Sequence, residues 1–120
     1  MNIKGTLPQK VEVYQDKKGT APFVDWLRSL KDIQARAIIR SRINRIRTGN
    51  FDNHRSIGQG IWELKLNYGP GYRVYYGNEN QNIVFLLIGG DKGSQDRDIK
   101  KAQKYWRDYK AFKVSSEQAL

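Results

Sequence analysis

A β-hairpin predicted over residues 62–76 constrains the fold of this chain more than any other feature of its sequence. The stretch reads Trp-Glu-Leu-Lys-Leu-Asn-Tyr-Gly-Pro-Gly-Tyr-Arg-Val-Tyr-Tyr, and its apolar and polar residues alternate around a Gly-Pro-Gly turn. Because successive side chains of a strand point to opposite faces, the hairpin has one apolar face and one polar face. A three-residue turn at 69–71 would pair Asn67 with Arg73 and Lys65 with Tyr75 on the polar face.

The remaining elements follow from hydrophobic periodicity and from start and stop residues. Pro22 is typical of a helix start, Asp32 of an N-cap, and Gly49 of the residue that follows a helix. Together these signals predict a strand at 11–14, helices at 22–30 and 32–49, a loop at 50–60 with a short strand around 55–57, a central strand at 83–88, a tight loop at 89–93 and a last helix from residue 94 or 95.

This order predicts an α+β fold. We expect a small antiparallel sheet of about four strands, packed against two N-terminal helices and followed by a C-terminal helix. A chain of 120 residues is long enough for one domain with a proper core, which we place at residues 1–113. Residues 114–120 are predicted to form a disordered tail.

The charge of the chain points to a polyanionic partner, either nucleic acid or an acidic protein. Lys and Arg number 22 against 12 Asp and Glu, which gives a formal net charge of +10. Cysteine is absent and His54 is the single histidine, so neither a thiolate nor a histidine-rich metal site is expected, although Asp and Glu could still hold magnesium. We expect no cofactor. We see no apolar run near the ~20 residues of a membrane span and no apolar leader, so we expect a cytoplasmic protein without membrane contact.

The polar face of the hairpin carries the groups that RNA cleavage without a metal needs. That reaction requires general acid–base groups and fixed positive charge near the phosphate. Arg73 is the best candidate because a guanidinium binds phosphate through two hydrogen bonds. Lys65 would bind phosphate or act as a base, and Glu63 would be a base or hold the neighbouring cations. Lys92 lies in a glycine-flanked loop before a helix, where phosphates often bind.

Other residues are candidates for RNA binding outside this chemical centre. Tyr75 and Asn67 lie on the same predicted face, and tyrosine rings commonly stack on unpaired bases. Basic residues on the outer faces of the second and last helices would contact RNA or would simply be solvated. The representatives that we choose from these helices are Arg40, Arg47, Lys101 and Lys104.

Several motifs of the chain, in the same order, resemble the RelE/ParE toxin superfamily, and within it the HigB-like addiction module killer branch. The resemblance covers roughly residues 10–110. The stretches that carry it are Pro22–Asp32, Gly49–Asn50, Gly58–Lys65, Tyr68–Tyr76, Leu86–Gln95 and Asp98–Ala102, of which the Gly-Pro-Gly-Tyr-Arg and Gly-Gly-Asp-Lys runs are the most specific.

The resemblance implies a RelE-like fold and the toxin of a type II toxin–antitoxin pair. Such toxins commonly cleave mRNA on the ribosome and are silenced by a cognate antitoxin, often with a helix-turn-helix domain, in a hetero-oligomer. It also implies that Arg73 stabilises the scissile phosphate, with Lys65 and Lys92 as further catalytic cations, whereas Glu63 stands where RelE has another lysine. Two alternatives stay open, a non-enzymatic ParE-like inhibitor of DNA gyrase and a simple RNA-binding protein.

Overall fold

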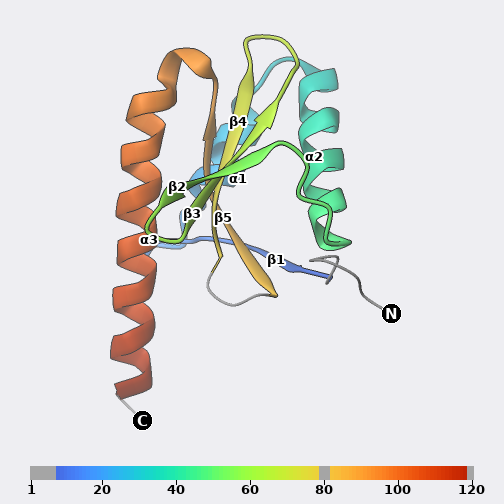
Figure 1. Ribbon diagram of the computed structural model, residues 1–120. Coiled ribbons are helices and arrows are strands. Elements are labelled where there is room, and N and C mark those ends of the chain that lie inside the picture. Colours follow the sequence, from blue (N-terminus) through green and yellow to red (C-terminus); the bar gives the residue numbers. More distant parts are fainter. Residues whose placement is uncertain (1–7, 79–81, 119–120) are drawn as a thin grey trace.

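The computed structural model describes residues 8–78 and 82–118 and has three layers (Figure 1). Helices α1 and α2 cover one face of a five-stranded sheet, and the long helix α3 covers the other. The elements in chain order are β1 (Lys10–Val13), α1 (Pro22–Ser29), α2 (Ile33–Arg47), β2 (His54–Gly58), β3 (Ile61–Leu66), β4 (Tyr72–Asn78), β5 (Ile83–Gly90), the 3₁₀ turn η1 (Lys92–Ser94) and α3 (Gln95–Gln118).

The α+β class is confirmed, and the arrangement is consistent with the RelE-like fold that the resemblance implied. The sheet differs from our prediction in two respects, because it has five strands and is mixed rather than antiparallel. Its order is β1-β5-β4-β3-β2, and β1 pairs with β5 in parallel while the other neighbours are antiparallel. Alternation of side chains identifies a strand but carries no information on its direction, so the sequence did not reveal this parallel edge.

The hairpin is confirmed, but its predicted register was wrong by two residues. Lys65 pairs with Arg73 and Glu63 pairs with Tyr75, so the connection spans residues 67–71 instead of 69–71. The longer turn contains two glycines with positive φ, Gly69 at 55° and Gly71 at 80°, and the amide of Gly71 donates to the carbonyl of Tyr68. A shift of two residues returns every side chain to its original face, so the two predicted faces of the hairpin hold.

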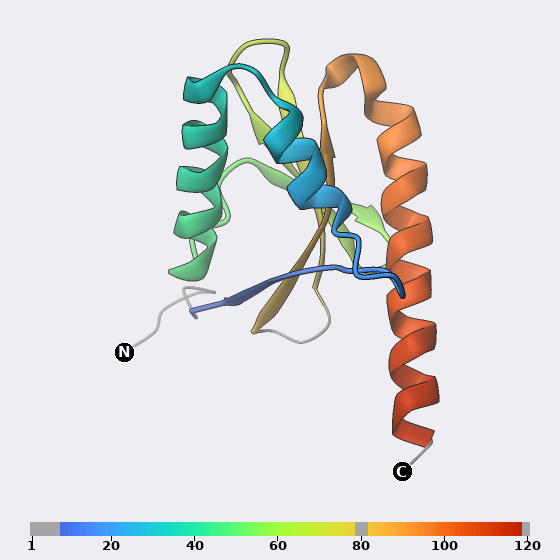
Figure 2. The same cartoon turned by 180° about the vertical axis from the view of Figure 1, so that it is seen from behind.

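Two apolar clusters hold the three layers together. The first lies between the α1–α2 layer and the sheet, where Phe23, Ile39 and Ile46 pack against Leu64 and Val74. The second lies under α3 on the opposite face, and its members are Tyr14, Ile61, Tyr75, Phe85, Leu87, Ile88, Ala102 and Trp106. The view from behind shows α1 and α2 on the side of the sheet away from α3 (Figure 2). Strand β5 serves both clusters, which explains why its sequence is apolar on both faces.

Helix α3 is longer than we predicted. It continues to Gln118, although we expected a disordered tail from Val114 onward. Residues 95–118 contain no glycine or proline that would end a helix, and this signal is more informative here than the loss of apolar periodicity. Residues 119–120, the last part of the predicted tail, lie outside the described residues.

Gly89 and Gly90 are the last residues of β5, although we predicted that they begin a loop. Glycine is required here because side chains from both layers lie directly against the backbone. A Cβ built on Gly89 would lie 2.2 Å from the Trp26 ring, and one on Gly90 would lie 1.7 Å from an Asp98 carboxylate oxygen. The two glycines thus allow α1 to pack closely on one face and α3 on the other at the end of β5, beside Arg73.

We expect Gly89→Ala to lower the free energy of unfolding by about 1–3 kcal/mol, the usual cost of overpacking a close-packed core. The added methyl group would displace the Trp26 ring from its place against Tyr72. Urea unfolding followed by tryptophan fluorescence measures this loss. Gly93→Ala is the matched control, because exposed Gly93, like Gly89, has no positive φ, and a Cβ there would meet no aromatic ring, only an Asp91 carboxylate oxygen at 3.2 Å. Equal stability of wild type and Gly89→Ala would contradict this packing.

Candidate functional site

The polar face of the hairpin meets the N-terminal end of α3 and forms one connected cluster. Glu63 and Lys65 come from β3, and Tyr75 and Arg73 come from the partner positions of β4. Gln95, the first residue of α3, reaches the same face through its side-chain amide. The cluster surrounds a pocket of about 250 Å³, which is lined by Asn53, His54, Arg55, Glu63, Lys65, Arg73 and Gln95.

Glu63 is the buried centre of this cluster, with only 3% of its surface exposed. Its carboxylate accepts hydrogen bonds from Arg55 Nε at 2.8 Å, Tyr75 OH at 2.9 Å and Gln95 Nε2 at 2.9 Å. Burial raises the pKa of Glu63, but the hydrogen bonds and the charge of Arg55 outweigh it and leave this pKa below its ordinary value. A carboxylate that is held in its ionised form and fully bonded braces its neighbours and is a weak base.

Arg73 is also buried, with 6% of its surface exposed, and it lies against Glu63. Its Nε is 3.7 Å from Glu63 Oε2, and its Nη1 donates to the Gly71 carbonyl at 2.7 Å. The Nε atom has no hydrogen-bond partner among the described residues. A buried guanidinium that is held in place by a carboxylate and a turn, and that lines the pocket, is positioned to bind an oxyanion.

Lys65 is an exposed cation of the site, and hydrogen bonds hold its backbone in place. The Lys65 amide donates to Asn53 O at 3.0 Å, and its carbonyl accepts from Asn53 Nδ2 at 3.1 Å and Arg42 Nη1 at 3.3 Å. Arg42 reaches this carbonyl from α2 and also donates to the carbonyl of Asp52. The end of β3 is thereby tied to the loop that precedes β2.

Lys92 lies next to the turn that holds Arg73. The end of β5 pairs with β4 at Arg73–Gly90, and Lys92 follows two residues later at the start of η1. A Cβ built on Gly71 would lie 3.2 Å from Arg73 Nη1 and 3.7 Å from Lys92 Cβ. Asp91 caps η1 by accepting from the Ser94 amide at 3.1 Å. The structure therefore places the chain at Lys92 beside Arg73, as the sequence suggested.

Several predicted RNA-binding residues lie outside the Arg73 cluster or already bond to other side chains of the protein. Tyr75 is fully buried and its hydroxyl is bonded to Glu63, which contradicts the predicted stacking of its ring on bases. Asn67 lies beyond β3 in the turn and does not pair with Arg73. Arg40 and Arg47 are exposed on α2, across the sheet from Arg73. Lys101 and Lys104 are exposed on α3, and Lys104 pairs with Asp108 at 2.7 Å.

Sequence reasoning missed three residues that build the site, namely Arg55, Gln95 and Arg42. Arg55 was within reach, because we predicted a strand around 55–57 and it pairs directly with Glu63 in the structure. Gln95 and Arg42 act across layers, and the register of one hairpin gives no information on which helix side chains meet it. We found no sequence signal that would have identified either one.

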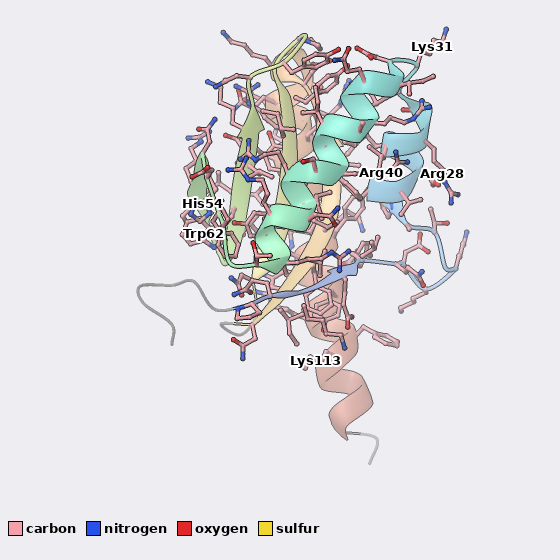
Figure 3. The ribbon with its side chains drawn as sticks, turned by 90° about the vertical axis from the view of Figure 1, so that its right-hand side faces the viewer. Arg28, Lys31, Arg40, His54, Trp62 and Lys113 are labelled. Atoms are coloured by element: carbon pink, nitrogen blue, oxygen red, sulfur yellow. The ribbon has the colours of Figure 1, made fainter. Side chains whose placement is uncertain are left out.

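His54 borders the same pocket as Arg73, but its ring packs on the other face of the sheet. Its ring is stacked between Trp62 at 4.7 Å and Phe51 at 5.2 Å, and its Nδ1 lies 2.8 Å from the Tyr76 hydroxyl. The side chains of His54 and Trp62 lie together at the edge formed by β2 and β3 (Figure 3). These contacts give the histidine a packing role that accounts for its position.

This histidine gives the stability of the protein a pH dependence. Burial lowers the pKa of His54 below its ordinary value of 6.5, so the fold stabilises the neutral ring. The free energy of unfolding is expected to be highest above pH 6.5 and to fall as the pH drops through the lowered pKa. Urea unfolding at a series of pH values measures this. His54→Phe keeps an aromatic ring between Phe51 and Trp62, and an unchanged slope below pH 6.5 in that variant would contradict the assignment.

Neither a metal site nor a membrane-spanning helix is present in the described part of the chain. Residues 8–78 and 82–118 contain no group of three or more His, Asp or Glu side chains placed to hold a metal ion. Over the same residues, every helix is too short or too polar to cross a membrane.

Comparison with known proteins gives a relative but no functional name. No family model matches the chain. A Haemophilus influenzae protein, described only as an uncharacterized protein, is 49% identical over 86 residues, which cover 72% of this chain and 87% of that protein. This level of identity over most of the relative shows common descent and a shared fold. The chain therefore belongs to the same family as this uncharacterized protein of Haemophilus influenzae.

Proposed function

We propose that the protein is the toxin of a type II toxin–antitoxin pair and that it cleaves mRNA during translation without a metal ion. The observation that carries the proposal is Arg73, a guanidinium that is held by Glu63 at the wall of the pocket, paired in register with Lys65 and placed beside Lys92. The resemblance of the hairpin and of the Gly-Gly-Asp-Lys run to RelE-like toxins supports the same reading.

The proposed reaction is an internal transfer at one phosphate of the RNA. The 2′-oxygen attacks the adjacent phosphorus, and the bond from phosphorus to the 5′-oxygen breaks. The 2′-hydroxyl gives up its proton to a base and the departing 5′-oxygen receives one, so the products are a 2′,3′-cyclic phosphate and a 5′-hydroxyl. Extra negative charge collects on the non-bridging oxygens as the bond forms, and fixed cations lower the barrier there.

The residues of the cluster take separate roles in this reaction. Arg73 binds the non-bridging oxygens, because its position is fixed by Glu63 and by the Gly71 carbonyl. Lys92 adds a second cation beside the turn. Lys65 is exposed and pairs with Arg73 across the hairpin, and its side-chain nitrogen is our candidate for the base that takes the proton from the 2′-hydroxyl. Glu63 braces Arg73, Arg55 and Gln95 and takes no proton from the substrate, since its pKa lies below the ordinary value.

The proposal includes partners that match the charge of the protein. With a net charge of +10, the chain would meet the mRNA and the ribosome, both polyanions, in the cytoplasm. The cognate antitoxin would be an acidic protein with a helix-turn-helix domain, and it would form a hetero-oligomer with the toxin. We expect its binding to cover Arg73 and Lys65, since covering these two cations blocks the proposed reaction.

The proposal is tested by adding the purified protein to a cell-free translation reaction and mapping the ends of the mRNA. We expect new 5′ ends in the coding region that appear only while translation proceeds. The same preparation is assayed for DNA breaks made by gyrase, the target that the ParE-like alternative predicts. Intact mRNA together with gyrase-dependent breaks would overturn the proposal in favour of that alternative.

A further inference from the structure

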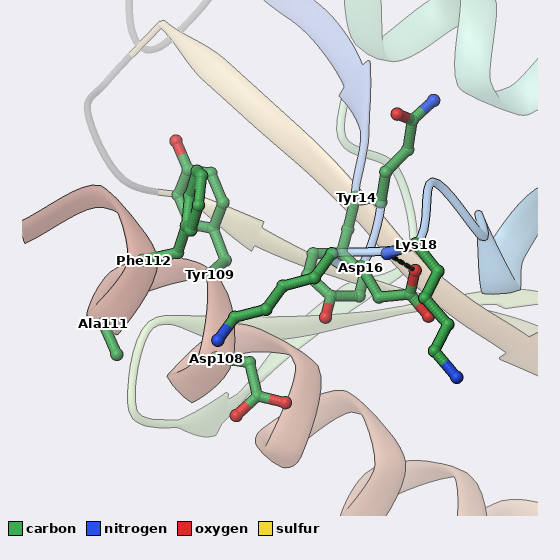
Figure 4. Close-up of a pocket in the computed structure, with 9 residues that line it drawn as sticks. Tyr14, Asp16, Lys18, Asp108, Tyr109, Ala111 and Phe112 are labelled. Atoms are coloured by element: carbon green, nitrogen blue, oxygen red, sulfur yellow. Dashed lines mark hydrogen bonds between the residues drawn. The ribbon is translucent and has the colours of Figure 1, made fainter. Parts of the chain in front are cut away.

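A second pocket lies about 20 Å from Gln95 along α3, at 1.5 Å of rise per helical residue. It has a volume of about 630 Å³ and lies between the loop after β1 and the C-terminal half of α3. Figure 4 shows Tyr109 and Phe112 from α3 across the pocket from Asp16 and Lys18 of the loop. The remaining lining residues are Tyr14, Gln15, Lys17, Asp108 and Ala111. We refer to this site as the β1–α3 pocket.

Three aromatic residues line the β1–α3 pocket, and two of them, Tyr109 and Phe112, lie on α3, whose last turns project from the body of the protein. Phe112 is 58% exposed and is one of two large apolar residues so exposed among those that the structure describes. The last turns of α3 extend beyond the sheet in both ribbon views (Figures 1 and 2), so no other layer packs on them. An apolar pocket beside an exposed phenylalanine is the type of surface that partner proteins use.

The charges at the rim determine what kind of partner fits. Both lining carboxylates are already engaged, because Asp16 accepts from the amides of Lys18 and Thr20, each at 2.9 Å, and Asp108 pairs with Lys104. The ammonium groups of Lys17 and Lys18 have no carboxylate partner within the described residues. Two free lysines on a chain of net charge +10 disfavour a second copy of this chain and favour an acidic partner.

The rings are better placed for an apolar side chain than for a nucleic acid base. Tyr14 is 4% exposed and stacks on Tyr105 with ring centroids 5.3 Å apart. Tyr109 stacks on Trp106 at 5.4 Å. Base recognition needs open ring faces, and neighbouring rings of the protein already cover faces of these two tyrosines. A branched or aromatic side chain, in contrast, needs only an apolar pocket of suitable size.

We propose that the β1–α3 pocket binds an acidic segment of a partner protein, which inserts one large apolar side chain beside Phe112 and pairs its carboxylates with Lys17 and Lys18. This inference does not rest on the proposed nuclease activity, because the pocket shares no residue with the Arg73 cluster. It assigns a protein-binding role to a surface for which the cleavage reaction has no use.

The test is a selection from a displayed library of random dodecapeptides, with the full-length protein as bait. The lesion variant Lys17→Glu/Lys18→Glu/Phe112→Ser removes the proposed contacts. The matched variant Arg28→Glu/Lys31→Glu/Ile33→Ser makes the same changes of charge and apolarity on the α1–α2 side, where Arg28 and Lys31 lie away from Lys113 (Figure 3). All six residues are exposed, so both variants should keep the fold, which circular dichroism confirms.

We expect the enriched peptides to share one large apolar residue flanked by Asp or Glu. When titrated one by one, they should bind wild type and the matched variant alike and the lesion variant at least about tenfold more weakly. The proposal would be overturned if no peptide is enriched, if the enriched peptides lack acidic residues, or if they bind the lesion variant as tightly as wild type. A different result would assign the pocket to RNA instead. In that case the wild type would bind single-stranded oligouridine more tightly than any selected peptide, and only the lesion variant would lose this binding.

Discussion

Replacing Arg73 with alanine is expected to lower the rate of mRNA cleavage by about 10²–10³-fold, the usual cost of losing one fixed donor to a charged transition state. The decrease in cleavage rate should be larger than any decrease in the fraction of folded protein. In the variant the Glu63 carboxylate keeps its hydrogen bonds to Arg55, Tyr75 and Gln95, so it still has partners after the Arg73 guanidinium is removed. The measurement is the initial rate of appearance of cleaved mRNA in a cell-free translation reaction.

Two further variants make this result specific. Arg73→Lys keeps the charge but loses the planar pair of donors, so it should recover only part of the rate. Arg28→Ala removes an exposed arginine from α1, on the other face of the sheet, and should leave the rate unchanged. A rate for Arg73→Ala within a factor of two of wild type, as our criterion, would remove Arg73 from the reaction.

The largest loss of stability is expected from Glu63→Ala, which should lower the free energy of unfolding by about 3–5 kcal/mol. This is the cost of leaving a buried charge without its partner, and Arg73 is only 6% exposed beside Glu63. The substitution also leaves the Tyr75 hydroxyl without its acceptor. Urea unfolding at pH 7 measures the difference.

The double variant Glu63→Ala/Arg73→Ala tests the physical reason for that loss. Removing both charges should cost less than the sum of the two single losses, because no unpaired ion stays buried. The pH dependence gives a second test. Since the pKa of Glu63 lies below its ordinary value of 4.5, its stabilising contribution is present above pH 4.5 and is lost as the pH falls through the lowered pKa. Additive losses at pH 7 would show that the two side chains do not interact.

The sequence predicted the elements that depend on local patterns and missed those that depend on contacts between layers. The hairpin, both N-terminal helices, the central strand and the start of α3 all follow from periodicity and caps. Asp32, for instance, accepts from the Ala35 amide, as an N-cap should. The direction of β1 and the long turn at 67–71 depend on tertiary contacts, among them the bond from Tyr68 OH to Asp32 Oδ2.

The candidate site shows the same division. Alternation alone placed Glu63, Lys65, Arg73 and Tyr75 on one face, and a register error of two residues left that assignment intact. The burial of this face could not be predicted, because it is α3 that covers the face and makes Tyr75 part of the core. The choice between base and brace for Glu63 likewise depended on Arg55 and Gln95, which reach it from β2 and α3.

The most direct test of the proposed reaction is the chemical identity of the new mRNA ends. Attack by the 2′-oxygen leaves a 5′-hydroxyl, so the downstream fragments should be ligated to an adaptor only after treatment with polynucleotide kinase and ATP. We predict kinase-dependent ends from wild type and their loss in Arg73→Ala. Intact mRNA, or fragments with 5′-phosphate ends that the Arg73→Ala variant produces equally well, would contradict the proposal.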